Sequence, residues 1–223
     1  MKKSLFLFLF FLALLANLTG IAFGITSLQV YSKPLIVPAL IIYFIVQGSA
    51  AGKQRYLILI ALFCSWVGDI LLLFDSRPEF FLAGLSAFLA AHIFYILFFY
   101  RIIQDKKLKP RILLFLVVAI YYACLIYLLF PHLDGMKYPV LVYGIVISMM
   151  LLLALHVSFI KDRLAGNLLL LGATSFVISD SLLAVNKFYN SFPGAGIMVM
   201  VTYAIAQYSI MQGALQYLSG KQN

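Results

Sequence analysis

The run GATSFVISDSLLAVNKF, from Gly172 to Phe188, places a carboxylate, Asp180, inside an apolar helix. The earlier run LILIALFCSWVGDILLLF, residues 57–74, does the same with Asp69. An ionised group at the centre of a bilayer costs roughly 2.5 to 3.5 kcal/mol on insertion scales, so intramembrane acids usually mark a site or a pathway. We interpret the two aspartates as acid catalysts embedded in a membrane.

The composition excludes an ordinary soluble domain. Of 223 residues, 65% are hydrophobic and 10% are charged, whereas soluble domains carry about 25% charged residues. In a soluble chain the net charge of +9 would suggest a nucleic-acid partner, but here the basic residues fall in short loops between apolar runs, where they orient helices. We therefore expect an integral membrane protein that forms one transmembrane domain over residues 1–223, with no nucleic-acid partner.

Eight apolar runs are long enough to cross a bilayer, which takes about 17 to 25 helical residues. None alternates apolar and polar residues as the strands of a membrane barrel do. The fold class we predict is all-α, a polytopic bundle of eight transmembrane helices at residues 4–24, 34–50, 56–74, 80–100, 112–130, 138–160, 166–186 and 193–218.

The loop charges predict the orientation of the helices, because basic residues are retained on the cytoplasmic side. With the N-terminus inside, twelve of the 16 basic residues are cytoplasmic, namely Lys2, Lys3, Lys53, Arg55, Arg101, Lys106, Lys107, Lys109, Arg111, Lys161, Arg163 and Lys221. The opposite side holds the other four, Lys33, Arg77, Lys137 and Lys187. An even number of helices then returns the C-terminus to the cytoplasm.

The first run also resembles a signal peptide, since two lysines precede the apolar residues 5–15 and small residues follow them. We expect a retained helix, because the apolar stretch continues to Ile25 and exceeds the roughly 7 to 15 residues of a signal's apolar region. Cleavage would leave seven helices in the same orientation.

The two aspartates are expected at similar depths in the outer half of the membrane. Asp69 lies 14 residues after Arg55, roughly 21 Å along a helix, and Asp180 lies 17 after Arg163, roughly 26 Å. Each could instead hold two helices together through a hydrogen bond to a polar side chain. Two like carboxylates at one depth repel each other, a cost that packing does not require, so we favour a functional pair.

The two aspartate-bearing runs are weakly similar to each other. They run in the same direction, and aligning Asp69 with Asp180 also matches Gly68 with Ser179. This similarity suggests a parallel duplication of two four-helix halves, residues 1–111 and 112–223, of the kind that builds a site at a repeat interface.

The fourth run carries small residues, which let a neighbouring helix approach closely, followed by His92 and Tyr95. His92 is expected near mid-membrane, either as a substrate contact or as a core histidine bonded to a carbonyl or a tyrosine. His132 falls in an outer loop and His156 at the cytoplasmic end, so a three-histidine zinc site is not expected. We predict no metal site.

Four further residues are candidates for binding a lipid. Lys33 and Lys187 are among the few basic residues on the outer side, and Lys187 lies two turns after Asp180, on the same helix face. Lys187 would either contact a lipid phosphate or extend to the headgroups as an interfacial anchor. Tyr203 and Gln207, one turn apart in the last run, are placed to line one cavity.

Several motifs together resemble the YhhN family of lysoplasmalogenases over most of the chain. They are Lys33-Pro34-Leu35 opening the second helix, Gly68-Asp69, the run FLAGLSAFLAAHIFY from Phe81 to Tyr95, Ser179-Asp180 leading to Lys187-Phe188, and the less distinctive YAIAQ from Tyr203 to Gln207. The resemblance implies a lysophospholipid substrate and hydrolysis of the vinyl ether bond of lysoplasmalogens to a fatty aldehyde and a glycerophospho-alcohol. It implies Asp69 and Asp180 as the catalytic pair.

This chemistry suits two carboxyl groups. Protonation of the β-carbon of a vinyl ether gives an oxocarbenium ion, which water traps as a hemiacetal that collapses to aldehyde and alcohol. The reaction needs an acid and an anion, a division of labour that glycosidases give to two carboxyl groups. It requires no metal or organic cofactor, and either aspartate can be the acid.

Two other classes of function remain open. A proton-coupled transporter also uses intramembrane acids but needs a polar path to both faces, whereas the cytoplasmic halves of the third and seventh runs are almost wholly apolar. A lipid-binding module would tolerate Asn in place of each aspartate. For any of these functions we expect a multi-pass protein of the bacterial inner membrane, surrounded by membrane lipids.

Overall fold

The protein is built from α-helices. The computed structural model describes residues 2–48 and 52–220, with only the backbone at 2, 3 and 53, so Lys221 of the predicted cytoplasmic set lies outside it. Within these ranges there are eight α-helices and no strand. The helices are α1 (Lys2–Ala22), α2 (Thr26–Val46), α3 (Lys53–Leu71), α4 (Pro78–Asp105), α5 (Ile112–Leu129), α6 (Lys137–Val157), α7 (Arg163–Ala184) and α8 (Ala195–Ser219). Short 3-10 turns follow α3 and α5, and a π-helical turn, Val185–Tyr189, extends α7.

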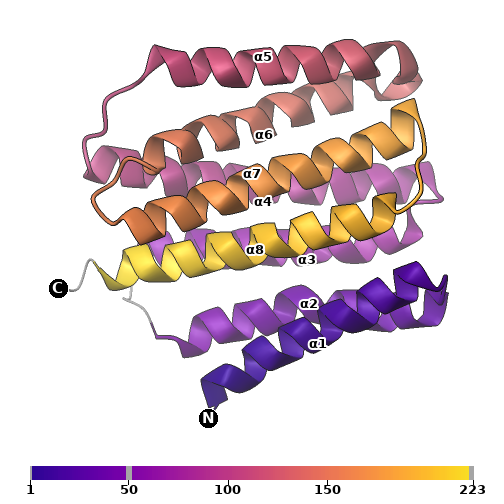
Figure 1. Cartoon of the computed structure of the whole chain (residues 1–223), viewed down its shortest axis with the longest axis horizontal. Helices are drawn as coiled ribbons and strands as arrows, with labels where there is room; N and C mark the ends of the chain where they lie inside the picture. The colour runs from indigo at the N-terminus through magenta and orange to yellow at the C-terminus, as the bar shows by residue number, and fades with distance from the viewer. Residues whose placement is uncertain (1, 49–51, 221–223) are drawn as a thin grey trace. The chain divides into compact units, whose positions relative to one another are not determined.

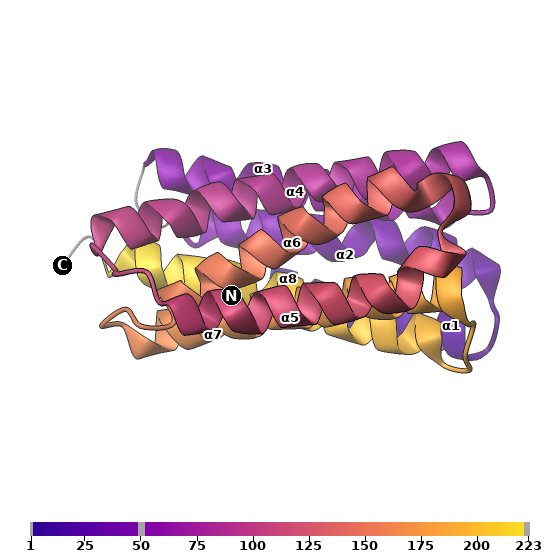
Figure 2. The ribbon, with the colours of Figure 1, turned by 90° about the horizontal axis from the view of Figure 1, so that it is seen from above.

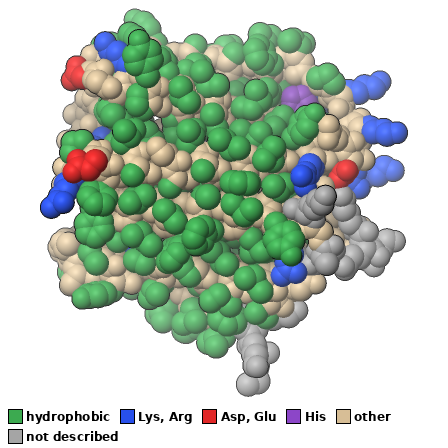
Figure 3. All heavy atoms as spheres, turned by 180° about the vertical axis from the view of Figure 1, so that it is seen from behind, with side chains coloured by type: hydrophobic (Ala, Val, Ile, Leu, Met, Phe, Trp, Pro, Cys, Tyr) green, Lys and Arg blue, Asp and Glu red, His purple; other side chains and the backbone are tan. Residues whose placement is uncertain are grey.

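Seven helical segments among the described residues are long and apolar enough to cross a membrane. The eighth helix, α8, has 25 residues but contains Gln207, Gln212 and Gln216, and it is not among the seven. The outer surface is apolar as well: Figure 3 shows a face covered mainly by hydrophobic side chains, with charged groups near its margins. The chain is an integral, multi-pass, all-α membrane protein, as predicted; the orientation of its termini stays a prediction.

The largest boundary error is at the start of the second helix. The second helix was expected to begin at Pro34, but α2 begins at Thr26, and both Pro34 and Pro38 lie inside it. A proline removes one intrahelical hydrogen bond, and a transmembrane helix tolerates this loss where another group supplies the missing donor. Here the donor is the indole nitrogen of Trp66 on α3.

The described residues fall into two compact units, one within residues 1–94 and 214–223 and the other over Tyr95–Gly213. In the first unit α1 packs along α2, and α2 packs against α3 (Figure 1). Gly68 of α3 lies under a ring of α4, because a Cβ added at Gly68 would come within 2.6 Å of the Phe88 side chain. The absence of a side chain at Gly68 therefore lets α4 approach α3 one residue before Asp69.

In the second unit α5, α6 and α7 follow one another as antiparallel neighbours, and Figure 2 shows α6 inclined to α5. Helices α7 and α8 approach at backbone distance, because a Cβ added at Gly172 would lie 2.7 Å from the backbone nitrogen of Ile210. Small residues at such crossings are typical of membrane helices. The single domain and the parallel duplication stay predictions.

Candidate active site

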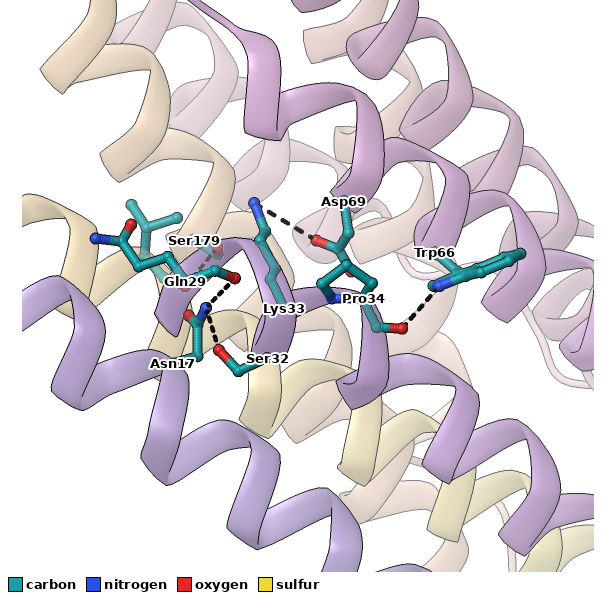
Figure 4. A network of polar contacts seen from close by, with 9 residues as sticks. Asn17, Gln29, Ser32, Lys33, Pro34, Trp66, Asp69 and Ser179 are labelled. Atoms are coloured by element: carbon teal, nitrogen blue, oxygen red, sulfur yellow. Dashed lines mark hydrogen bonds and ion pairs between the residues drawn. The ribbon is translucent and has the colours of Figure 1, made fainter. Parts of the chain in front are cut away.

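In the first unit the structure brings together two of the predicted residues, Lys33 of α2 and Asp69 of α3. Lys33 Nζ lies 3.9 Å from Asp69 Oδ1 (Figure 4), and the side chains are 20% and 3% exposed. This distance is that of an ion pair rather than a direct hydrogen bond. A nearly buried carboxylate therefore has a cation beside it, which lowers the cost of keeping its charge inside the bundle.

Polar contacts on both sides of α2 surround this ion pair. Towards α3, the indole nitrogen of Trp66 donates to the carbonyl oxygen of Pro34 at 2.9 Å. Towards α1, the amide of Asn17 donates to Ser32 Oγ at 3.2 Å and to the carbonyl oxygen of Gln29 at 3.4 Å (Figure 4). These bonds tie α2 to both of its neighbours in the turns around Lys33.

His92 lies on α4 with none of its surface exposed. Its predicted mid-membrane level stays a prediction. Its role in substrate binding stays a prediction.

In the second unit Asp180 of α7 accepts a hydrogen bond from Tyr143 of α6, with Tyr143 Oη 2.5 Å from Asp180 Oδ2. One residue further along α7, Ser181 Oγ donates to the carbonyl oxygen of Val177 at 2.6 Å. Because its single proton is used there, the contact at 2.7 Å between Ser181 Oγ and Tyr121 Oη has the tyrosine as donor. Two phenol groups, from α5 and α6, therefore lie beside the Asp180 turn.

Three other predicted residues meet in the second unit. Tyr95 of α4 donates its hydroxyl to Gln207 Oε1 of α8 at 2.7 Å, and both side chains are fully buried. The ring of Phe176 contacts Tyr95 and Tyr203 edge to face, with centroids 6.3 and 5.5 Å apart. Nε2 of Gln207 has no hydrogen-bond partner among the described residues, so this buried amide keeps one donor group to offer to a ligand.

Lys187 lies in the π-helical turn after α7 and is exposed. A π-helix closes its hydrogen bonds over five residues instead of four, so a spacing of seven residues does not by itself put Lys187 on the helix face of Asp180. Whether Lys187 holds a phosphate or anchors the helix end stays a prediction.

A cavity of about 450 Å³ lies between α1 and α2. Apart from Tyr31 and Ser32, its twelve lining residues are all apolar, among them Leu9, Ala16 and Ala39. Ligand pockets have volumes of about 300 to 1,000 Å³. The lining suits a hydrocarbon rather than a charged solute.

The described residues contain no group of three or more His, Cys, Asp or Glu side chains that could hold a metal ion. Asp69 is paired with Lys33, Asp180 with Tyr143 and Tyr95 with Gln207.

Sequence reasoning missed Tyr143, Tyr121 and Trp66. Each acts across a helix-helix contact, over 37, 60 and 32 residues of sequence. A run that is apolar on every side gives no indication of which face meets which neighbour. For Trp66 a signal existed, because two prolines four residues apart in one span leave a carbonyl in need of a donor.

The fold and these polar pairs define a polytopic helical membrane protein with acidic groups inside its apolar helices. The family model described as the YhhN family matches residues 28–214, so this chain belongs to the YhhN family.

Several proteins whose sequences are similar to this chain are named as enzymes. The lysoplasmalogenase TMEM86B of Mus musculus is 32% identical over 85% of this chain and 76% of its own length. The lysoplasmalogenase TMEM86B of Homo sapiens is 33% identical over 75% of this chain and 67% of its own. A lysoplasmalogenase of Mycobacterium bovis is 29% identical over 73% of this chain and 61% of its own. No solved structure matches the chain significantly.

Proposed function

We propose that this chain is a membrane-embedded lysoplasmalogenase, which hydrolyses the vinyl ether bond of lysoplasmalogens to a fatty aldehyde and a glycerophospho-alcohol. The observation that carries the proposal is the similarity, over 85% of the chain, to a relative named lysoplasmalogenase. The two acidic groups, Asp69 buried and Asp180 half-buried, support the same reaction class, because vinyl ether hydrolysis needs an acid and an anion. The substrate is a lysophospholipid taken from the surrounding membrane lipids.

The proposed reaction consumes one water and regenerates the acid. A carboxylic acid transfers its proton to the β-carbon of the vinyl ether, and the electron pair of the double bond forms the new C–H bond. Water adds to the α-carbon of the resulting oxocarbenium ion and loses a proton to the carboxylate that the first step left, which restores the acid. A carboxylic acid then protonates the glycerol oxygen as its bond to the hemiacetal carbon breaks, so that it leaves as the alcohol, while the hemiacetal hydroxyl returns a proton to the carboxylate and becomes the aldehyde carbonyl.

We propose Asp69 as the anion and Asp180 as the proton donor. Asp69 has the ammonium group of Lys33 beside it, an arrangement that favours the charged carboxylate. Asp180 has instead a hydrogen bond from the neutral phenol of Tyr143, which stabilises a carboxylate less than an ammonium group does, so Asp180 is the one we propose to carry the proton. This assignment gives the two carboxyl groups the different environments that acid and anion roles require.

The proposed substrate contacts are Lys33, His92, Tyr95, Lys187, Tyr203 and Gln207. The unused donor group of Gln207 supports a contact to a substrate oxygen, because a buried amide N–H without an acceptor costs roughly 1 to 3 kcal/mol. Lys33 would act mainly through Asp69, and Lys187 through the phosphate. We propose the bacterial inner membrane as the location, with which the similarity to a mycobacterial relative is compatible.

The proposal is tested by incubating the purified protein in detergent with a lysoplasmalogen and, separately, with the matching saturated-ether lysolipid. We expect aldehyde from the first lipid alone, because the saturated ether has no double bond to protonate. Release of a fatty acid, or equal turnover of both lipids, would contradict vinyl ether hydrolysis.

A further inference from the structure

Helix α2 contains two prolines spaced by one helical turn, Pro34 and Pro38. In a regular helix the backbone N–H of residue 38 would donate to the carbonyl oxygen of residue 34, but proline has no N–H. The Pro34 carbonyl therefore loses its intrahelical donor. In the apolar core of a membrane such a group needs another partner, because no water is available to it.

Trp66 of α3 supplies that partner. Its indole Nε1 lies 2.9 Å from the Pro34 oxygen, a normal hydrogen-bond distance (Figure 4). The indole is oriented within its own helix by Phe63, whose ring centroid lies 5.6 Å away. Trp66 is the only tryptophan in the chain.

The bond lies beside the Lys33–Asp69 ion pair and joins the same two helices. Pro34 directly follows Lys33, and Trp66 precedes Asp69 by three residues, less than one turn. A lysine cannot fix this geometry, because its ammonium is a point charge on a flexible stem of four carbons. The indole bond is directional and sets the register of α2 against α3 where the ion pair forms.

We propose that Trp66 is a positioning residue, which holds Asp69 opposite Lys33 by replacing the hydrogen bond that Pro38 cannot make. The inference rests on the proposed catalytic function of Asp69. It explains why an indole N–H from α3 is directed at a carbonyl inside α2, and it predicts that the role of Trp66 depends on Pro38.

A double-mutant cycle tests that dependence. Trp66→Phe keeps an aromatic ring but removes the donor, and we expect kcat for vinyl ether hydrolysis to fall about 10-fold, with KM changed less than about 2-fold. Pro38→Ala restores a backbone N–H to the Pro34 carbonyl and should itself change kcat less than about 2-fold. In the Pro38→Ala background, Trp66→Phe should then cost less than about 2-fold in kcat.

Tyr56→Phe is the matched control, because it removes a polar group from an exposed aromatic side chain of the same helix, α3. It should leave kcat unchanged. An equal loss from Trp66→Phe in both backgrounds, or wild-type kcat in Trp66→Phe, would overturn the proposal.

Two measurements do not depend on activity. A single tryptophan gives one indole N–H resonance, and we expect it downfield and slow to exchange with deuterium, compared with an indole introduced in the turn between α1 and α2 by Phe23→Trp in a Trp66→Phe background. The other measurement is a double-mutant cycle on the ion pair. The effects of Lys33→Met and Asp69→Asn on the free energy of unfolding should be non-additive in the wild type and close to additive when Trp66→Phe is also present.

Fast exchange of the Trp66 indole, or undiminished coupling, would overturn the positioning role even if the enzyme is active. Failure of the wild type to release aldehyde would overturn the proposed function, and these two measurements would still decide the role of Trp66.

Discussion

The phenol of Tyr143 on α6 donates a hydrogen bond to Oδ2 of Asp180 on α7, with the two oxygens 2.5 Å apart. The bond crosses between two helices that pack side by side, so it fixes the Asp180 carboxyl group in one orientation. A proton donor must face its substrate carbon with a defined geometry. Tyr143 is therefore expected to matter for the chemical step, although it was not among the residues predicted from the sequence.

Tyr143→Phe should lower kcat for vinyl ether hydrolysis by up to about 10-fold, since a hydrogen bond to a neutral carboxyl group contributes roughly 0.5 to 1.5 kcal/mol. Steady-state kinetics in mixed micelles measure this. The control is Tyr122→Phe, which also removes a phenol between neighbouring helices, where Tyr122 Oη donates to the carbonyl oxygen of Leu141 at 3.2 Å. Equal kinetics for the two variants would separate Tyr143 from catalysis.

Removing the cation beside Asp69 should destabilise the protein. Lys33→Met keeps the length of the side chain but leaves a nearly buried carboxylate without its ion-pair partner, which costs about 3 kcal/mol in typical cases. The double variant Lys33→Met with Asp69→Asn should recover most of this loss, because no buried charge remains. Unfolding followed in detergent measures the effect, and an unchanged midpoint for Lys33→Met would mean that the ion pair contributes nothing to stability.

Lys187→Gln separates a phosphate contact from an interfacial anchor. If Lys187 holds the substrate phosphate, KM should rise roughly 10-fold or more while kcat is nearly kept, because the contact is the same in ground and transition states. Arg77→Gln, which removes another basic side chain expected on the outer side, is the control at matched micelle concentration. Indistinguishable kinetics for the two variants would leave Lys187 as an anchor.

The predicted orientation places both termini and the loop around Lys107 in the cytoplasm, and the loop around Arg77 outside. In a background without Cys64 and Cys124, Lys107→Cys should react with an impermeant thiol reagent only after cells are opened. Arg77→Cys should react in intact cells. The reverse pattern would invert the whole topology.

The helices could be predicted from the sequence, because a membrane span is recognised by its length and apolarity. Both are properties of a single segment and do not depend on its neighbours. The largest boundary error, at the start of α2, came from treating Pro34 as a helix start. In a soluble protein that choice is sound, because an internal proline leaves one backbone carbonyl of the helix without its hydrogen-bond donor. Here a side chain from another helix compensates for the loss, and such a contact is visible only once the helices are packed.

The candidate site could be predicted in part. An aspartate in an apolar run is conspicuous, so Asp69 and Asp180 were identified from the sequence. Their partners differ in this respect. Lys33 was predicted as a lipid contact, but in the structure it pairs with Asp69. The sequence around Lys33 indicates only that it lies near the outer interface, so this partner could not be predicted. Tyr143 could not be distinguished from Tyr138, the other tyrosine of α6, whose side chain is exposed.

Mass spectrometry of the aldehyde released from a lysoplasmalogen in D₂O tests the central claim most directly. Protonation of the β-carbon by a carboxylic acid that has equilibrated with solvent predicts one deuterium on the carbon next to the aldehyde group, with no aldehyde from the saturated-ether lysolipid. Asp69→Asn and Asp180→Asn should each lower the rate of release by at least about 100-fold. Aldehyde without deuterium, or wild-type rates in both variants, would contradict acid-catalysed vinyl ether hydrolysis by these two residues.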